Sequence, residues 1–282
     1  MNDDALILDR PLSAAGHGTA VTTRVYVWKH VFILQGRGKF VDRSERPNSR
    51  LAVSLFVAQG KPMRLKANGE PMRDYHAVVF APGVRREVFD GSAAEYTIVD
   101  IDIAHPAYEA IEPLLKPGEV LELPRAETRC LQNLLGMRFL QPLPCAEVHT
   151  LFDRAVTLVS GTARWNVRRR DRRVYKALEL IEQRPLDELS LGVLAQHTFL
   201  SESRLRHLFR EEMGCTVSQY IRWACVHKAF AAWKPGMPFS EATAKAGFYD
   251  PAHFNHAVRD HFAQRPSAML KDNTIQVRRC EC

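Results

Sequence analysis

The sequence predicts an α+β protein of two domains, with a β-rich first part and an all-helical second part. Short runs of β-forming residues, separated by Gly, Pro and Asn, occupy residues 25–103. Beyond about residue 172 the apolar residues recur at helical spacing instead. A length of 282 residues also exceeds what one hydrophobic core usually supports. We therefore expect domains at residues 1–165 and 172–271.

Five runs predict the strands of a β-sandwich or β-barrel. They are residues 25–28, 30–41, 50–60, 75–84 and 96–103. Within the third run, Leu51, Val53, Leu55 and Val57 alternate with other residues, which is the period of a strand. The segments between the runs have the composition of turns.

Two amphipathic helices are expected within about residues 126–163. Leu131, Leu134 and Leu135 recur at helical spacing, and so do the apolar residues between 148 and 159. The stretch QPLP at 141–144 separates the two helices. Their apolar stripe has two readings, a cover for the sheet or the seam of a dimer, and the pattern leaves both open.

The charge of the chain is uneven. Lys and Arg number 39 against 32 Asp and Glu, and residues 168–271 hold 17 basic and 11 acidic residues. The charge-dense run RWNVRRRDRRVY at 164–175 marks the expected domain boundary. A basic second part suggests nucleic acid as its partner, although a solvated basic surface explains the charge equally well.

The sequence predicts neither a membrane-spanning helix nor a secretory signal. The apolar runs are far shorter than the roughly 20 residues of a membrane helix. The start MNDDALILDR carries acidic residues where a secretory signal has basic ones. We expect a cytoplasmic protein with no membrane partner.

Six cysteines are scattered along the chain. They are Cys130, Cys145, Cys215, Cys225, Cys280 and Cys282. They show neither a CxxC pair nor zinc-like spacing with histidines, so free thiols are expected. Cys280 and Cys282 form a CxC pair that is compatible with a soft metal or with oxidation.

The second part predicts a series of helices. Their approximate ranges are 172–184, 190–197, 201–212, 216–233, 240–246, 251–262 and 267–271. Ser201 is a good N-cap for the third helix, and a short helix, a tight turn and a capped second helix make a helix-turn-helix. Leu205, Leu208 and Phe209 face inward. The outward positions are Ser203, Arg206, His207 and Arg210.

A similar unit recurs about fifty residues later, at 239–262. Ser240 is expected to cap its first helix, Gly247 to take the left-handed turn conformation, and Asp250 to cap a helix that starts at Pro251. The inward stripe is Phe254, Ala257, Val258 and Phe262. The outward positions are Ala252, His253, His256 and Arg259.

Three histidines of this second unit, His253, His256 and His261, could bind a metal, act in acid/base catalysis or contact DNA. His253 and His256 share the outer face with Arg259, whereas His261 falls beside the inward stripe and is expected in the core or at its rim. A metal would need a third ligand and would be repelled by Arg259, and acid/base catalysis would need a pocket. A face that enters a DNA major groove needs only hydrogen-bond donors and phosphate contacts. We therefore predict DNA reading, with no metal and no catalytic residue.

Residues 172–271 resemble the DNA-binding domain of AraC/XylS-type bacterial transcription regulators. The matching residues are Ala195, Ser201, Leu205, Phe209 and Gly214 in the first unit, and Ala246-Gly247-Phe248, His253-Phe254, His261-Phe262 and Pro266-Ser267 in the second. The resemblance implies that a long helix, here about 217–233, joins two units that read double-stranded DNA. Where the family usually has Arg, this chain has His207, His256 and Cys225. Histidine cannot make the bidentate contact of arginine to guanine, so individual base contacts should differ.

The resemblance also implies a cupin-like β-barrel in the first part, which senses a small molecule or drives dimerisation. His30 and His76 stand alone rather than in a metal-binding cluster, which argues against a cupin enzyme and against a cofactor. Basic and aromatic side chains would suit an anionic effector. The candidates are Arg37, Tyr75, His76, Arg85 and Arg86.

We therefore expect a sequence-specific DNA-binding transcription regulator, not an enzyme, that is controlled through its first domain. A small-molecule effector, RNA polymerase and a second copy of the chain are the further partners that this interpretation admits. Two other classes remain as alternatives. One is a cupin-type enzyme with a tethered helical domain, and the other is a regulator controlled by a protein partner or by cysteine oxidation without a small ligand.

Overall fold

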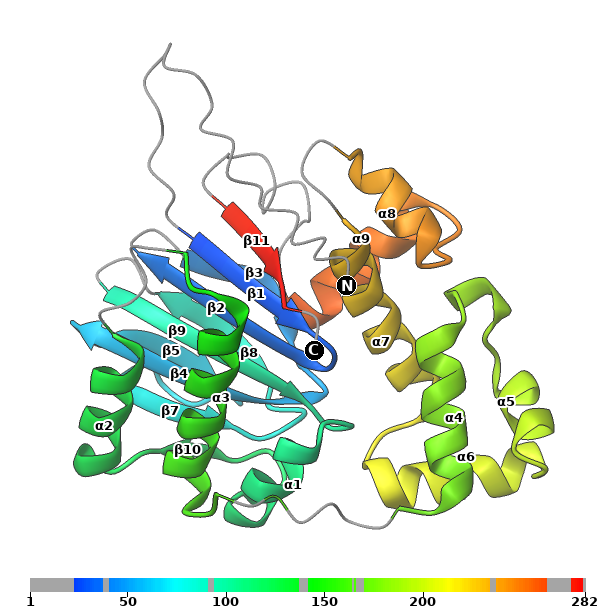
Figure 1. Cartoon of the computed structure of the whole chain (residues 1–282), viewed down its shortest axis with the longest axis horizontal. Coiled ribbons are helices and arrows are strands. Elements are labelled where there is room, and N and C mark those ends of the chain that lie inside the picture. The colour runs from blue at the N-terminus through cyan, green and yellow to red at the C-terminus, as the bar shows by residue number, and fades with distance from the viewer. Residues whose placement is uncertain are drawn as a thin grey trace.

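The computed structural model describes residues 23–37, 41–90, 94–136, 142–163, 165, 170–233, 237–262 and 275–280. A β-rich amino-terminal region and a helical carboxy-terminal region lie side by side (Figure 1). The prediction of an α+β protein with this order of regions is confirmed.

A seven-stranded sheet forms the centre of the amino-terminal region. Its order is β10 (Val120–Glu122), β7 (Ala77–Phe80), β4 (Ala52–Gly60), β9 (Ala94–Asp102), β2 (Val31–Arg37), β1 (Thr23–Trp28) and β11 (Ile275–Arg279). Neighbouring strands are antiparallel, except that β11 is parallel to β1. The last strand of the chain thus joins the edge of a sheet built from the first part, as Figure 1 shows in red and blue.

A four-stranded sheet packs on one face of the larger sheet. Its order is β3 (Val41–Asn48), β8 (Arg86–Asp90), β5 (Met63–Ala67) and β6 (Arg73–Tyr75). Between the sheets, the ring of Phe56 meets those of Phe80 and Phe89 edge to face, with centroids 5.0 and 5.6 Å apart. Among the described strands, β10 and β11 end the larger sheet without a ladder to the smaller one. The region is therefore an open two-sheet sandwich, and the predicted closed, cupin-like barrel is not confirmed.

Strand β4 lies in the middle of the larger sheet and is buried on both faces. Val53, Leu55 and Val57 face the helices, whereas Phe56 and Ala58 face the smaller sheet. The predicted alternation is present. Ala52, Phe56 and Ala58 on the other face are apolar as well because that face of the strand is also covered, and the one polar residue between them, Ser54, is buried and hydrogen-bonded to Asp100.

Three helices cover the outer face of the larger sheet (Figure 1). They are α1 (Pro106–Ile111), α2 (Arg125–Leu135) and α3 (Cys145–Ser160). Leu131, Leu135, Val148 and Phe152 are buried against that face. The stripe predicted within residues 126–163 therefore covers the sheet, which is the first of its two readings.

Six α-helices build the described part of the carboxy-terminal region. They are α4 (Arg172–Gln183), α5 (Leu191–His197), α6 (Glu202–Met213), α7 (Val217–Ala232), α8 (Phe239–Lys245) and α9 (Pro251–Phe262), with a 3-10 turn η2 (Leu186–Glu188) before α5. The predicted helices agree with these bounds to one residue at each end. Helix α7 is central, and Trp223, Tyr220 and Phe209 are almost completely buried around it. The predicted last turn at 267–271 lies outside the described residues.

No helix in the described part of the chain combines the length and the apolar character that crossing a membrane requires.

The cap predicted at Ser240 is wrong. Helix α8 begins at Phe239 with Pro238 in the cap position, so Ser240 lies in the first turn. Its carbonyl accepts a hydrogen bond from Thr243 Oγ1 at 2.8 Å. The fixed φ of proline orders the chain just before the helix, which moves its start ahead of the serine.

The prediction of free thiols is wrong for one pair. Cys145 and Cys280 form a disulfide across a sequence separation of 135. Cys130, Cys215 and Cys225 are free, the first exposed and the other two buried. The sequence did not predict this pairing because the two cysteines come together only when β11 pairs with β1.

Candidate nucleic-acid interface

The first candidate reading unit consists of α5, a turn and α6. Ser201 caps α6 as predicted, because its hydroxyl accepts a hydrogen bond from the amide of Arg204 at 3.2 Å. Leu205, Leu208 and Phe209 are buried in the helical core. The helical period then turns the other face of α6 to solvent. The predicted reading residues on that face are all exposed: Ser203, Arg206, His207 and Arg210.

The second candidate unit consists of α8, a turn and α9. Gly247 has a φ of 81°, and Asp250 accepts a hydrogen bond from the amide of His253 at 2.6 Å, so both of these turn predictions are confirmed. Phe254, Ala257 and Val258 are buried. The predicted reading residues of α9 are all exposed: Ala252, His253, His256 and Arg259.

His261 lies apart from the other two histidines of α9. Its ring centroid is 5.0 Å from that of Trp223, and its Nδ1 is 3.3 Å from the carbonyl oxygen of Ser49. Burial lowers the pKa of His261. The predicted position at the rim of the core is confirmed, and His253 and His256 are the two that belong to the exposed face.

Helix α7 connects the two units. Thr216 and Gln219 form a capping box at its start, with the amide of Gln219 donating to Thr216 Oγ1 at 3.2 Å. The ammonium of Lys228 donates to the carbonyls of Ile181 and Arg184, the latter at 2.6 Å, and so caps the end of α4. These contacts fix α7 against the helix that precedes both units.

A metal site was one of the alternatives for the histidines. Throughout the described ranges, no three His, Cys, Asp or Glu side chains gather closely enough to hold a metal ion.

The two units and the helix between them match a known protein family. A family model described as a helix-turn-helix domain matches residues 194–272, from α5 past the end of α9. Residues 194–272 therefore form a helix-turn-helix domain of the AraC type. The predicted resemblance of this part of the chain to AraC-type DNA-binding domains is confirmed.

Solved structures of ToxT from Vibrio cholerae are similar to the AraC-type domain together with the region before it. ToxT of strain O395 aligns with a TM-score of 0.55 at 9% identity, over 86% of this chain and 97% of that chain. ToxT of strain SCE256 with bound unsaturated fatty acid aligns with a TM-score of 0.53 at 8% identity, over 86% and 94%. ToxT bound to (E)-4-(8-methylnaphthalen-1-yl)but-3-enoic acid aligns with a TM-score of 0.53 at 8% identity, over 86% of this chain and 97% of that chain. At these identities the likeness shows the fold. No curated protein matches the chain.

The AraC-type domain contacts the amino-terminal region through Asp102, at the end of β9. The carboxylate accepts hydrogen bonds from two side chains of α7, Trp223 Nε1 at 2.6 Å and the Tyr220 hydroxyl at 3.2 Å. His30 Nδ1 lies 3.9 Å from the same carboxylate. Burial alone would raise the pKa of Asp102, but the nearby His30 lowers it overall. A buried, ionised carboxylate therefore holds the centre of the domain interface.

Two histidines beside Asp102 have opposite pKa shifts. Burial works to lower the pKa of His30, but the Asp102 carboxylate outweighs it, so this pKa is raised. Burial lowers the pKa of His227 to about 3. Its ring is enclosed by Phe32 and Trp223, with centroids 4.4 and 4.1 Å away. A proton on His227 therefore opposes the docked arrangement.

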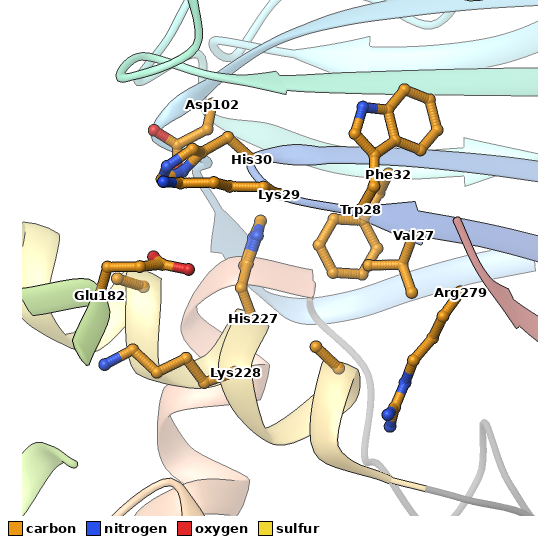
Figure 2. A pocket seen from close by; sticks show the side chains of 12 residues that line it. Val27, Trp28, Lys29, His30, Phe32, Asp102, Glu182, His227, Lys228 and Arg279 are labelled. Carbon is orange, nitrogen blue, oxygen red and sulfur yellow. The ribbon is translucent and has the colours of Figure 1, made fainter. Parts of the chain in front are cut away.

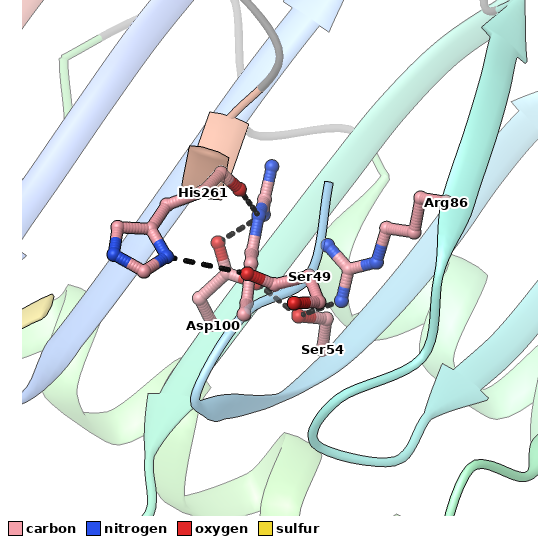
Figure 3. A network of polar contacts seen from close by, with 6 residues as sticks. Ser49, Ser54, Arg86, Asp100 and His261 are labelled. Atoms are coloured by element: carbon pink, nitrogen blue, oxygen red, sulfur yellow. Dashed lines mark hydrogen bonds and ion pairs between the residues drawn. The ribbon is translucent and has the colours of Figure 1, made fainter. Parts of the chain in front are cut away.

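A second contact joins the end of α9 to the larger sheet (Figure 3). Arg50 Nε donates to the carbonyl of His261 at 3.3 Å, and its guanidinium also pairs with Asp100. Asp100 accepts from the Ser54 hydroxyl, which in turn accepts from Arg86 Nη2 at 2.6 Å. Burial lowers the pKa of Arg86 to about 9. A polar chain thus runs from the second unit into the core of the sandwich.

A third contact lies in the charge-dense run that marks the predicted domain boundary. Arg170 is buried and donates to the carbonyl of Ile103 at 2.8 Å. It also pairs with Glu109 of α1 at 3.3 Å. The entry to the AraC-type domain is therefore anchored on the amino-terminal region.

A pocket of about 210 Å³ lies between the edge of the larger sheet and α7 (Figure 2). Its apolar lining is Val27, Trp28, Phe32, Ala224 and Ala231. Its polar lining is Lys29, His30, Asp102, Glu182, His227, Lys228 and Arg279. These residues come from β1, β2 and the turn between them, β9, α4, α7 and β11, so no local sequence pattern could have revealed the pocket.

The predicted effector residues lie outside this pocket. Arg37 is exposed and its Nε donates to Glu95 at 2.6 Å. Tyr75 is buried between the sheets, whereas His76 and Arg85 are exposed. They stand on separate strands and turns, and their role in ligand binding stays a prediction.

Proposed function

We propose that the chain is a transcription regulator that binds double-stranded DNA sequence-specifically through α6 and α9. The observation that carries this proposal is the pair of capped helices, each with a buried apolar stripe and an exposed polar face, in one AraC-type domain. A recognition helix of a helix-turn-helix presents such a face to the major groove. No residue is proposed to be catalytic.

The residues of the two faces divide into base and phosphate contacts. On α6, Arg206 suits a bidentate contact to guanine, and Arg210 suits a phosphate. On α9, His253 and His256 each offer a single hydrogen bond to a base edge, and Arg259 a phosphate contact. Ser203, His207 and Ala252 complete the two faces.

The length of α7 suits two adjacent readings of one DNA face. Its 16 residues span about 24 Å. One turn of DNA spans roughly 34 Å, and the bodies of α6 and α9 extend the reach beyond the ends of α7. The two helices would therefore enter successive major-groove segments.

The second part of the proposal is control by a small molecule at the pocket between the regions. ToxT has been crystallised with a fatty acid and with a naphthyl-substituted butenoic acid, both carboxylic acids with apolar bodies. Here Trp28 and Phe32 supply apolar walls, and Lys29 and Arg279 supply positive charge. The volume of about 210 Å³ is below that of most drug-sized sites, so a short apolar carboxylate suits it best.

Coupling between pocket and DNA follows from the position of α7. Ala224, His227 and Lys228 line the pocket and belong to the helix that connects the two reading units. A ligand that prefers one arrangement of α7 against the sheet would shift how α6 and α9 are presented. Contacts with RNA polymerase and self-association remain predictions.

Binding to the protein's own upstream DNA, compared with scrambled DNA over a salt series, tests the first part. Selective binding is expected for the wild type and its loss for the double variant Arg206→Ala with His256→Ala. Arg129→Ala is the control, because it removes an exposed arginine from α2, on the sheet side of the molecule. Equal affinity for both DNAs, falling in parallel with salt, would leave only phosphate attraction and would refute sequence-specific reading.

Octanoate tests the second part as a probe. It is expected to change the affinity of the wild type for its DNA, and Lys29→Gln is expected to reduce that effect without changing affinity in its absence. An unchanged affinity at millimolar octanoate would count against a short carboxylate as the effector.

A further inference from the structure

The chain returns to its amino-terminal region after the AraC-type domain. Strand β11 runs parallel to β1, with Ile275 opposite Thr23 and Arg279 opposite Val27. The amide of Cys280 then donates to the carbonyl of Val27 at 2.9 Å. The DNA-binding domain is thus held at both of its ends.

A disulfide makes the second attachment covalent. Cys280 is buried, and its partner Cys145 is the first residue of α3. The ring that it closes runs from residue 145 to residue 280 and so contains every helix of the DNA-binding domain. No other described cysteine is disulfide-bonded, since Cys130, Cys215 and Cys225 are free.

The attached strand also reaches the connecting helix of the domain. Arg279 Nη2 donates to the carbonyl of Trp233, the residue that ends α7, at 2.7 Å. Arg279 lines the pocket between the two regions (Figure 2). On the other side, Arg278 Nη1 donates to the carbonyl of Leu143 at 3.0 Å, just before α3. The strand therefore joins α7, the pocket and the start of α3.

We propose that Cys145 and Cys280 are a redox-sensing pair, oxidised by a hydroperoxide, whose disulfide holds the DNA-binding domain against the amino-terminal region and weakens its binding to DNA. This rests on the proposed function, since it is DNA binding that the pair would regulate. A protein that binds the chromosome works among reducing thiols, where a disulfide is usually transient and redox-sensing rather than structural.

Cys145 is the residue that reacts first. It is half-buried, whereas Cys280 is buried, so a peroxide reaches Cys145 more easily. It stands in the first turn of α3, within disulfide distance of the strand that carries Cys280. Burial raises the pKa of Cys215 to about 12 and that of Cys225 to about 11, which keeps these two thiols protonated.

The chemistry proceeds in two displacements. The Cys145 thiolate attacks one oxygen of the hydroperoxide, the O–O bond breaks, and the departing alkoxide or hydroxide takes a proton to leave as alcohol or water. The Cys280 thiol then loses its proton and attacks the sulfur of the sulfenic acid, and the S–O bond breaks as hydroxide leaves and is protonated. Two thiols and one hydroperoxide give one disulfide, one alcohol or water, and one water. A cellular dithiol reverses the reaction by thiol–disulfide exchange.

Reduction leaves β11 held by its backbone pairs with β1 and by the arginine contacts alone. The domain then has one covalent connection, through the segment before α4, and the two reading helices can adjust together to the spacing of a DNA site. Oxidation restores the ring and opposes that adjustment. The disulfide therefore acts on DNA binding through geometry, without touching the reading faces.

Peptide mapping of the full chain tests the chemistry. The Cys282→Ser variant is treated with hydrogen peroxide, alkylated and digested without reduction, so that its carboxy-terminal peptide carries a single cysteine. A link between the peptides of Cys145 and Cys280 is expected, and its loss after treatment with a dithiol. Persistently free Cys145 and Cys280 would overturn the proposal.

DNA affinity at fixed salt tests the consequence. Oxidised wild type is expected to bind its DNA at least about fivefold more weakly than reduced wild type. Cys280→Ser should bind like reduced wild type under both conditions, and Cys130→Ser should keep the wild-type difference. Equal affinity of the oxidised and reduced wild type, tighter binding when oxidised, or a redox effect that survives in Cys280→Ser would each refute the regulation.

The two proposals fail in different ways. If the reduced protein selects its DNA but oxidation changes nothing, the redox proposal falls and the DNA-binding function stands. If even the reduced protein and Cys280→Ser fail to select their DNA, the proposed function falls and takes the regulation with it, whatever the peptide map shows.

Discussion

The two helix-turn-helix units share one plan and differ in what surrounds them. Helices α5 and α6 of the first unit pack on α4 and α7 of their own domain. Helix α9 of the second unit also contacts β3, and the carbonyl of Asp260 accepts a hydrogen bond from the amide of Ser49 at 3.3 Å. The second unit is therefore the place where the amino-terminal region holds the DNA-binding domain.

The turns of the two units also differ in how closely other segments surround them. In the first, Phe199 has a φ of 56° and its side chain is 94% exposed. In the second, a Cβ on Gly247 would lie 2.3 Å from the amide nitrogen of Leu186. The first turn is strained but open, and the second is enclosed by the segment before α5.

The two copies of the helix-turn-helix motif are therefore expected to have different roles in this chain, one in DNA affinity and one in regulation. The first unit is supported within its own domain, so we expect it to dominate DNA affinity. The second is bound to the region that carries the pocket, so we expect it to carry regulation. Each of the following changes tests one side of this contrast.

The largest effect is expected at the enclosed turn. Gly247→Ala combines a left-handed backbone with a clash against main chain, so it should lower the free energy of unfolding by about 3 kcal/mol. Gly214→Ala is the control, because Gly214 has a φ of 69° and open space around its Cβ, and it should cost about 1 kcal/mol. Denaturant unfolding measures both. Equal losses would show that the turn is not enclosed as described.

The buried histidine of the interface predicts acid sensitivity. The pKa of His227 is about 3 in the folded chain and about 6.5 when unfolded, so the unfolded state binds the extra proton between these values. Stability from this group is complete above pH 6.5 and is lost as the pH falls, by about 2 kcal/mol at pH 5. Unfolding at pH 7.5 and pH 5 should show this loss in wild type and in the exposed control His76→Gln, and a smaller loss in His227→Phe. The same loss in His227→Phe would assign the sensitivity to other groups.

The two reading helices should contribute unequally to DNA binding. Arg206→Ala should weaken binding by about 2 kcal/mol, because it removes a bidentate contact, and His256→Ala by about 1 kcal/mol, because it removes a single hydrogen bond. Affinities for the native site at one salt concentration measure both. A larger loss at His256 would reverse the assignment of the dominant unit.

The smallest effect is expected at the open turn. Phe199→Gly removes the strain of a non-glycine residue in the left-handed conformation, which is about 1 kcal/mol. Glycine also makes the unfolded chain more flexible, which destabilises the fold by about 0.5 kcal/mol. The variant should therefore be more stable by about 0.5 kcal/mol, as thermal unfolding would show. Destabilisation would mean that the exposed ring makes a contact that stabilises the fold.

Much of the geometry of the proposed DNA-reading site was predictable because its determinants are local. Ser201 and Asp250 mark helix starts through hydrogen bonds that span three residues, and the buried stripe of α6 follows from a period of 3.6. These rules placed all eight candidate reading residues on exposed faces. They failed at Ser240, where a neighbouring proline moved the helix start.

The pocket and the disulfide were not predictable because their determinants are distant in sequence. Asp102 and Trp223 are 121 residues apart, and Cys145 and Cys280 are 135 apart. No sequence-spacing rule relates residues this far apart, because each contact depends on how α7 and β11 pack against the sheet. The five basic and aromatic effector candidates named from the sequence have the same limit, because composition does not say which strands lie side by side.

The sequence by itself determined the order of strands and helices, the two capped helix-turn-helix units and the residues on their outer faces, because hydrophobic period and capping act within a few residues. Only the tertiary structure decided that the sandwich is open, that the second unit is held by Arg50 and the domain by Asp102, and that the last strand returns to the first. Those outcomes depend on burying apolar surface and pairing buried charges between segments more than 100 residues apart, for which the chain carries no local signal.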